Sequence, residues 1–179
     1  MGKEGRKGAA KGARSRRAER ADYRKRMLAF LAKFFIIYAF LTALVELADL
    51  SFLTRLVASA AAFPFGFKVL GSVVLIDGKT FAVTNACTGL SSAAILAALV
   101  FGLKKPSPGK KIAVFLAGLA ALLLLNIPRV MLVLFAAESG FDADAMHVFT
   151  WFLMSAAILA IWYYGSKRLA GADGLEGFI

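Results

Sequence analysis

The sequence predicts an all-α integral membrane protein with a four-helix transmembrane core, an outer interfacial helix and an extracytoplasmic β-hairpin. Composition is the first reason: 60% of the 179 residues are hydrophobic and 18% are charged, whereas soluble domains are about 45–50% apolar. The second reason is that the apolar residues gather in four long stretches. The third is that Lys and Arg concentrate in the tail and in alternate connections, as they do on the cytoplasmic side of membrane proteins. The length favours a single domain.

The N-terminal segment is strongly basic. Residues 1–26 contain eleven Lys or Arg and three acidic residues, which is +8 of the chain's net charge of +11. Such a segment could bind nucleic acid, but an apolar stretch follows directly at Met27. We therefore interpret residues 1–26 as a disordered cytoplasmic tail that fixes topology and contacts anionic lipid, with no nucleic-acid partner.

The predicted membrane spans cover about residues 27–49, 87–103, 112–137 and 147–165. At about 1.5 Å per residue, the first span rises roughly 34 Å, enough to cross a hydrocarbon core of about 30 Å. It is longer than the roughly 7–15 apolar residues of a signal peptide, so we interpret it as an uncleaved anchor. The second span is at the lower length limit. Asn126, Pro128 and Arg129 interrupt the third span near its end.

Two further elements are expected between the first two spans. Residues 51–65 have apolar side chains at helical spacing but include Arg55 and Pro64, which predicts a short helix at the outer surface rather than a span. Residues 68–85 are rich in strand formers, and Asp77-Gly78 between two such runs indicates a hairpin. Because lipid does not tolerate an open sheet edge, this hairpin should lie outside the membrane.

Charge sets the predicted topology. The lysine-rich turn at residues 104–111 and the basic residues 167–168 join the N-terminal tail on the cytoplasmic side. The membrane domain then covers residues 27–168, and residues 169–179 form a cytoplasmic C-terminal tail. The sequence therefore predicts a multi-pass protein of the cell membrane with both termini inside.

Three chemically distinctive residues fall in one predicted layer. Cys87 and His147 begin the second and fourth spans at the outer face. Arg129 follows Ile112 by 17 residues, which places it roughly 26 Å up the third span. All three should therefore lie near the outer interface, with the candidate site facing the extracytoplasmic side.

Each of these residues also has a purely structural interpretation. A lone Cys87 often serves as a small packing residue, Arg129 could extend to the headgroups, and His147 could cap a helix. However, a charge inside a membrane span usually faces the bundle interior and marks a functional site. The single Cys and single His exclude an internal disulfide and Cys-rich or multi-His metal sites, so no cofactor is expected.

The pattern is typical of nucleophilic catalysis. A thiolate is favoured beside a helix start and a cation, and Cys87 would attack a carbonyl and form an acyl-enzyme. The backbone N–H groups of Thr88, Gly89 and Leu90, together with Arg129, could hold the resulting oxyanion. Gly89 would let the substrate backbone approach closely.

Two supporting roles complete this interpretation. His147 is the candidate general acid and base, which protonates the leaving amine and activates the acceptor. Asn126 lies one helical turn before Arg129 and could fix its direction.

These residues resemble the motifs of a known family. The segments Ala86-Cys87-Thr88-Gly89-Leu90 and Asn126-Ile127-Pro128-Arg129, with the later His147, are similar to the three motifs of the exosortase/archaeosortase family. The resemblance covers about residues 84–165, and the Thr after the cysteine is more similar to archaeal members. Relatives often have more spans, and they often place Gly-Trp where this chain has Thr150-Trp151.

The resemblance implies a membrane-embedded cysteine protease and transpeptidase. Such an enzyme would cleave the C-terminal sorting signals of exported surface proteins near the outer membrane face and transfer the proteins to an acceptor such as a lipid or a glycan. Its protein partners would carry a short motif, a membrane helix and a basic tail.

The competing functional class is a non-enzymatic membrane binding subunit or transporter component, in which Arg129 and His147 bind an anionic ligand and Cys87 only packs. A rhomboid-like serine protease is disfavoured because the sequence lacks G-x-S-x-G.

Overall fold

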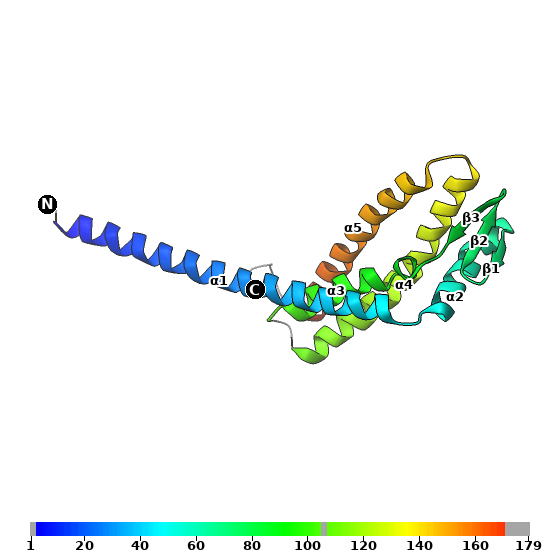
Figure 1. The fold of residues 1–179 in the computed structure, drawn as a ribbon. Helices are drawn as coiled ribbons and strands as arrows, with labels where there is room; N and C mark the ends of the chain where they lie inside the picture. Colours follow the sequence, from blue (N-terminus) through cyan, green and yellow to red (C-terminus); the bar gives the residue numbers. More distant parts are fainter. Residues whose placement is uncertain (1–2, 105–106, 171–179) are drawn as a thin grey trace.

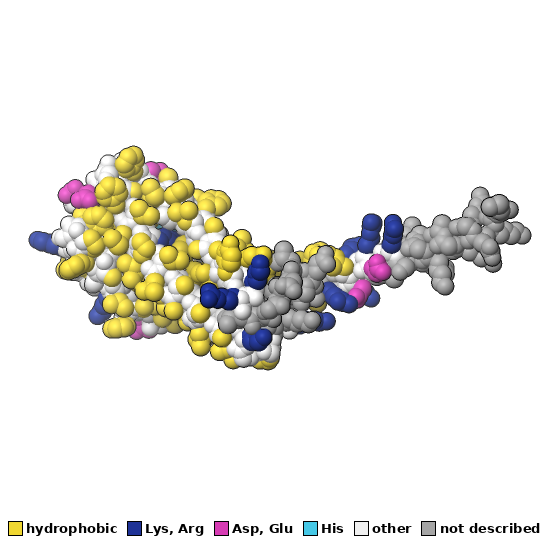
Figure 2. Space-filling model, turned by 180° about the vertical axis from the view of Figure 1, so that it is seen from behind, with side chains coloured by type: hydrophobic (Ala, Val, Ile, Leu, Met, Phe, Trp, Pro, Cys, Tyr) yellow, Lys and Arg dark blue, Asp and Glu magenta, His cyan; other side chains and the backbone are white. Residues whose placement is uncertain are grey.

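The computed structural model describes residues 3–104 and 107–170, and within this part the fold is mostly helical (Figure 1). The helices are α1 (Lys3–Leu47), α2 (Ser51–Ala62), η1 (Phe63–Phe65), η2 (Asn85–Thr88), α3 (Leu90–Gly102), α4 (Pro108–Glu138) and α5 (Ala143–Ala170). The strands are β1 (Lys68–Leu70), β2 (Val73–Ile76) and β3 (Lys79–Ala82). Three of these helices, α1, α4 and α5, are long and apolar enough to cross a membrane. Figure 2 shows the hydrophobic side chains that cover much of one face of the helical body, as lipid contact requires.

Helix α1 is longer than the first predicted span. It runs without a break from Lys3 to Leu47 and extends well beyond the other helices at its N-terminal end (Figure 1). Residues 1–26 were predicted to be a disordered tail, whereas residues 3–26 continue the helix. Ala, Arg and Lys make up most of this segment, and all three are strong helix formers. The C-terminal tail predicted at residues 169–179 lies almost entirely outside the described residues.

The second predicted span is occupied by a shorter helix. Residues 87–103 contain the end of η2, a break at Gly89 and the 13 residues of α3. A helix of this length rises about 20 Å, short of the roughly 30 Å of a hydrocarbon core. Helix α3 packs against α1, α4 and α5, so its neighbours cover it on several sides. Because these neighbours bury it on several sides, α3 has apolar side chains all around its axis although it is too short to span the membrane.

Helices α4 and α5 also differ from their predicted forms. Helix α4 continues through Asn126 and Pro128 without interruption. A proline removes one helical hydrogen bond, and membrane helices tolerate this where neighbouring elements shield the freed carbonyl. Helix α5 begins at Ala143, where Asp142 Oδ1 accepts hydrogen bonds from the N–H groups of Asp144 (2.9 Å) and Ala145 (3.2 Å). His147 therefore lies in the second turn of α5 rather than at its start.

A small sheet lies at the end of the molecule opposite the N-terminus (Figure 1). Strands β2 and β3 form an antiparallel hairpin in which Ile76 pairs with Lys79. Asp77 and Gly78 both have positive φ, 45° and 78°, which is the backbone of the two-residue turn that hairpins favour. The structure adds a third strand, β1, which pairs with β2 and was not expected as a separate element.

Helix α2 joins this sheet to α4. Its buried face packs with β2 and the C-terminal half of α4 in one hydrophobic cluster, whose buried members are Val57, Ala58, Ala61, Ala62, Val74, Ile76, Val83, Val130, Leu134 and Ala137. Its other face exposes large apolar side chains, including Phe52 and Leu56. Such a two-sided apolar helix suits a membrane interface. The cluster holds α2 and the sheet against the end of α4 that carries Arg129.

The close packing of α3, α4 and α5 depends on Gly118. A methyl group at Gly118 of α4 would overlap Leu96 of α3 and lie 2.8 Å from Ile161 Cγ2 of α5. Small residues at helix crossings allow membrane helices to approach closely. We expect Gly118→Ala to destabilise the protein by about 1–2 kcal/mol, because overpacking outweighs the gain in helix propensity.

Gly109→Ala is the matched control, because Gly109 lies in the same helix with open space around it. We expect this variant to melt at or above the wild-type temperature in detergent, whereas Gly118→Ala melts below it. Equal melting temperatures for the two variants would contradict the packing role of Gly118.

Candidate active site

Cys87 lies in a tight turn between the sheet and α3. The turn is the 3-10 helix η2, and the backbone N–H of Cys87 donates to the carbonyl of Thr84 (2.9 Å). Gly89 follows with a left-handed φ of 86°, and α3 begins at Leu90. The cysteine was predicted to begin the second span itself, but it precedes the α-helix by three residues. The left-handed residue is the reason, because it breaks the chain direction between η2 and α3.

Two side chains of η2 hold this turn in place. The Asn85 side-chain amide donates to the carbonyl of Val45 (3.1 Å), one of the last carbonyls of α1, which otherwise lack helical partners. Thr88 is fully buried, and its hydroxyl donates to the carbonyl of Asn85 (2.6 Å). The N–H of Leu90 in turn donates to the Thr88 hydroxyl (3.4 Å). The Leu90 N–H predicted to hold an oxyanion is thus already directed at Thr88.

Asn126 connects the cysteine turn to α4. It is fully buried, and its side-chain amide donates to the carbonyl of Cys87 (2.5 Å). Gly89 is buried directly against it, because a Cβ at position 89 would lie 3.1 Å from the Cβ of Asn126. Gly89 was predicted to let the substrate backbone approach, whereas in the structure its missing side chain makes room for Asn126. Asn126 therefore fixes the position of the Cys87 backbone.

Arg129 connects Asn126 to α5. It is only 6% exposed, and its Nη1 donates to Asn126 Oδ1 (3.2 Å) while Nη2 lies 3.3 Å from His147 Nε2. An arginine only donates, so His147 accepts through Nε2 and, when neutral, carries its proton on Nδ1. The Thr150 hydroxyl donates to the carbonyl of His147 (2.9 Å). A continuous chain of hydrogen bonds thus runs from the Cys87 carbonyl through Asn126 and Arg129 to His147.

The thiol itself has different neighbours. Cys87 is partly buried, and its Sγ lies 3.8 Å from the hydroxyl of Thr84. Within the described part of the chain, no hydrogen bond joins the Cys87 thiol to His147 or to Arg129. Thr84 was not predicted as a site residue, and its position three residues before the cysteine in the same polar segment was the available signal.

A small cavity of about 20 Å³ adjoins this network. Its lining comes from α1, η2, α3, α4 and α5: Tyr38, Ala86, Ser91, Ser92, Ile95, Arg129, Trp151, Met154, Ser155 and Ile158. The guanidinium Nε of Arg129 is buried and makes no hydrogen bond to any described residue. A buried donor without a partner is costly, so this atom is a candidate donor for an acceptor that binds beside Arg129. Tyr38 and the serines on α3 and α5 were not predicted as part of the site.

The fold and this buried polar layer define a helical membrane protein whose Cys, Arg and His are connected at one end of the helices. In the comparison with known protein families, residues 20–163 match the family described as transmembrane exosortase. The match covers most of the chain, and this protein belongs to the transmembrane exosortase family. The family supports an enzyme of the protease or transpeptidase kind. Comparisons with curated proteins and with solved structures produced no match.

Proposed function

We propose that this protein is a membrane cysteine transpeptidase that cleaves C-terminal sorting signals of exported surface proteins and transfers the proteins to an acceptor. The main observation that supports this proposal is the chain of hydrogen bonds from the Cys87 carbonyl through Asn126 and Arg129 to His147. It unites residues from three separate segments of the sequence. A buried cation and an imidazole on one hydrogen-bonded path to the cysteine turn are the groups that the proposed chemistry needs.

The charge at Arg129 supports the role of Cys87 as nucleophile. Arg129 is buried, and its hydrogen-bond partners, Asn126 and His147, are uncharged when the imidazole is neutral. A buried cation without an anionic partner strongly favours a nearby anion. The Cys87 thiolate and the oxyanion formed by its attack are the anions that the proposed reaction supplies. Arg129 would therefore stabilise both the attacking group and the intermediate.

The reaction would proceed in two stages. In the first, the Cys87 thiolate adds to the scissile carbonyl, the C–N bond breaks, and the leaving amine takes a proton, which leaves a thioester. In the second, the acceptor nucleophile attacks the thioester, gives up its proton and restores the thiolate. We assign the proton transfers to His147 as general acid and base. His147 contacts Arg129 rather than the thiol, so in this scheme it acts on the amine and the acceptor.

The membrane setting supports an extracytoplasmic site. The turn that carries Cys87 adjoins the sheet and α2, while the Lys- and Arg-rich segments lie near the N-terminus of α1, beyond α3 and at the end of α5. By the positive-inside rule the basic end faces the cytoplasm, so the opposite end, with Cys87, faces outward. Substrates would present a scissile bond just outside the bilayer, and a lipid or glycan would serve as acceptor.

Alkylation of the single thiol tests this proposal. Because Cys87 is the only cysteine, the label reports on that residue alone. We expect Arg129→Gln to slow alkylation by small reagents about tenfold or more, because loss of a nearby cation disfavours the thiolate. Arg55→Gln is the control, since Arg55 is an exposed arginine on α2 outside the polar network.

Equal alkylation rates for wild type and Arg129→Gln would contradict activation of Cys87. That result would favour the non-enzymatic alternative, in which Arg129 and His147 bind an anionic ligand and the thiol only packs. The Arg55→Gln variant should react at the wild-type rate, which separates a local effect from a change in overall charge.

A further inference from the structure

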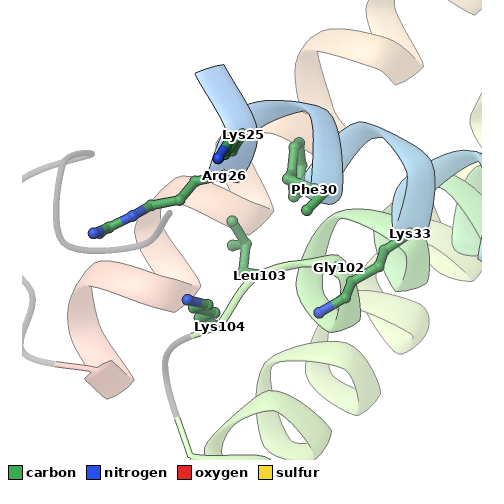
Figure 3. A pocket seen from close by; sticks show the side chains of 8 residues that line it. Lys25, Arg26, Phe30, Lys33, Gly102, Leu103 and Lys104 are labelled. Atoms are coloured by element: carbon green, nitrogen blue, oxygen red, sulfur yellow. The ribbon is translucent and has the colours of Figure 1, made fainter. Parts of the chain in front are cut away.

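A second pocket lies at the opposite end of α3 from Cys87, between α1 and the segment that follows α3 (Figure 3). Its volume is about 190 Å³. The lining residues are Lys25, Arg26, Ala29, Phe30, Lys33, Gly102, Leu103 and Lys104. None of them belongs to the polar network around Cys87, and half of them are cationic. The proposed transpeptidase activity does not use this pocket.

The cations of this pocket are only partly neutralised. Arg26 pairs with Asp22 (2.5 Å), but both side chains are more than half exposed. Among the described residues, Lys33 and Lys104 make no hydrogen bond or ion pair, and no acidic side chain lines the pocket. Lys111, whose ammonium group donates to the backbone carbonyl of Leu103, adds a further positive charge beside the pocket. The pocket therefore presents a concentrated positive charge that an anion would neutralise.

The wall between these charges is apolar. Leu103 is only 5% exposed and lies with Phe30 between the basic side chains in the view of Figure 3. Gly102 allows the close contact of α3 with α1, because a Cβ there would lie 3.1 Å from Phe30 Cε2. A soluble anion would gain little from this apolar surface. A ligand with a charged head and an apolar chain would use both parts.

Lys33 shows where such a ligand would lie. It is exposed and lies within the apolar part of α1, seven residues or about 10 Å along the helix from Arg26. A lysine at this depth can extend its charged end toward the interface, and Figure 3 shows its side chain directed to the side of α1 where Lys104 lies. The pocket thus spans the boundary between the hydrocarbon region and the headgroups.

We propose that this pocket binds one anionic phospholipid of the cytoplasmic leaflet. Its phosphate would lie between Lys33 and Lys104, and an acyl chain would lie along Phe30 and Leu103. Basic pockets at the ends of membrane helices recognise anionic headgroups by charge and by charge-assisted hydrogen bonds. The lipid would tie α1 to the α3–α4 connection, a contact that the helix crossing at Gly102 already begins.

Native mass spectrometry of the full chain in detergent tests this site. The protein is titrated with phosphatidylglycerol, with phosphatidylcholine and with inorganic phosphate. We expect one tightly retained phosphatidylglycerol, weaker retention of phosphatidylcholine and no displacement by phosphate. The double variant Lys33→Gln/Lys104→Gln should weaken phosphatidylglycerol retention by about tenfold or more, because it removes charge-assisted hydrogen bonds to the phosphate.

The matched control is Lys110→Gln/Lys167→Gln, which removes the same charge from the same end of the molecule but outside the pocket. We expect this control to retain the lipid within about twofold of wild type, since charge-assisted contacts act only at hydrogen-bond distance. Equal losses in both double variants, or displacement of the lipid by inorganic phosphate, would overturn the proposal. Lys104→Gln alone, on an exposed residue, gives the same test if the double variant does not fold.

Discussion

Replacement of Cys87 by Ala or Ser is expected to abolish processing of substrate proteins while the protein stays folded in the membrane. The chain has no other thiol, so no second cysteine can take over. Loss of the nucleophile in covalent catalysis costs on the order of 10⁴-fold or more in rate. Cys87 is partly buried, and the side-chain contact of its thiol among the described residues is the exposed one with the Thr84 hydroxyl (3.8 Å), so the substitution should disturb the fold little.

The measurement is the shift in size of an exported protein with a C-terminal motif, membrane helix and basic tail when it is co-expressed with each variant. Ser139→Ala, on an exposed residue at the end of α4, is the control and should process substrate normally. Hydroxylamine should release an acyl group from the wild-type protein and none from Cys87→Ser. Normal processing by Cys87→Ala would exclude the enzymatic function altogether.

Replacement of Arg129 should have the second largest effect. Arg129 makes two directed contacts at once, to Asn126 (3.2 Å) and to His147 (3.3 Å). Removal of one group that stabilises an oxyanion typically costs about 10²–10³ in rate. We therefore expect Arg129→Gln to reduce processing by that factor.

Arg129→Lys tests the geometry of the site rather than its charge. A lysine keeps the positive charge but cannot reproduce the planar, forked contacts of a guanidinium. We expect this variant to process substrate far more slowly than wild type, at a rate closer to Arg129→Gln. Wild-type activity in Arg129→Lys would show that a point charge suffices and would remove the role assigned to the Asn126 and His147 contacts. Arg55→Gln should remain fully active, because Arg55 is exposed on α2.

The membrane helices and the hairpin could be predicted because their signals are local. Apolar stretches of sufficient length indicated α1, α4 and α5. The Asp77-Gly78 pair indicated the β2–β3 hairpin, since both residues tolerate the positive φ that the turn requires. Helix α3 was predicted as a span because it is as apolar as one. Its short length became clear only from the fold, where the left-handed Gly89 delays the start of the helix.

The packing role of Gly89 could not be predicted from the neighbouring residues in the sequence. Because Gly89 lies beside the candidate nucleophile, we predicted that it leaves room for the substrate backbone. The space beside its Cα is instead filled by Asn126, which lies 37 residues further along the chain. Likewise, the contact of Thr84 with the thiol depends on the curvature of η2. Such contacts depend on how separate elements pack, and sequence spacing carries no information about them.

The sequence by itself determined that this is a membrane protein with long apolar helices, and it predicted Cys87, Arg129 and His147 as candidate site residues, because composition, apolar length and helix rise are properties of the chain itself. Only the tertiary structure decided how these residues are connected. It joins the Cys87 carbonyl to Asn126 and His147 to Arg129, and it leaves the thiol beside Thr84 instead of His147. The physical reason is that hydrogen bonds form at about 3 Å, whereas helix rise places a residue only to within a turn.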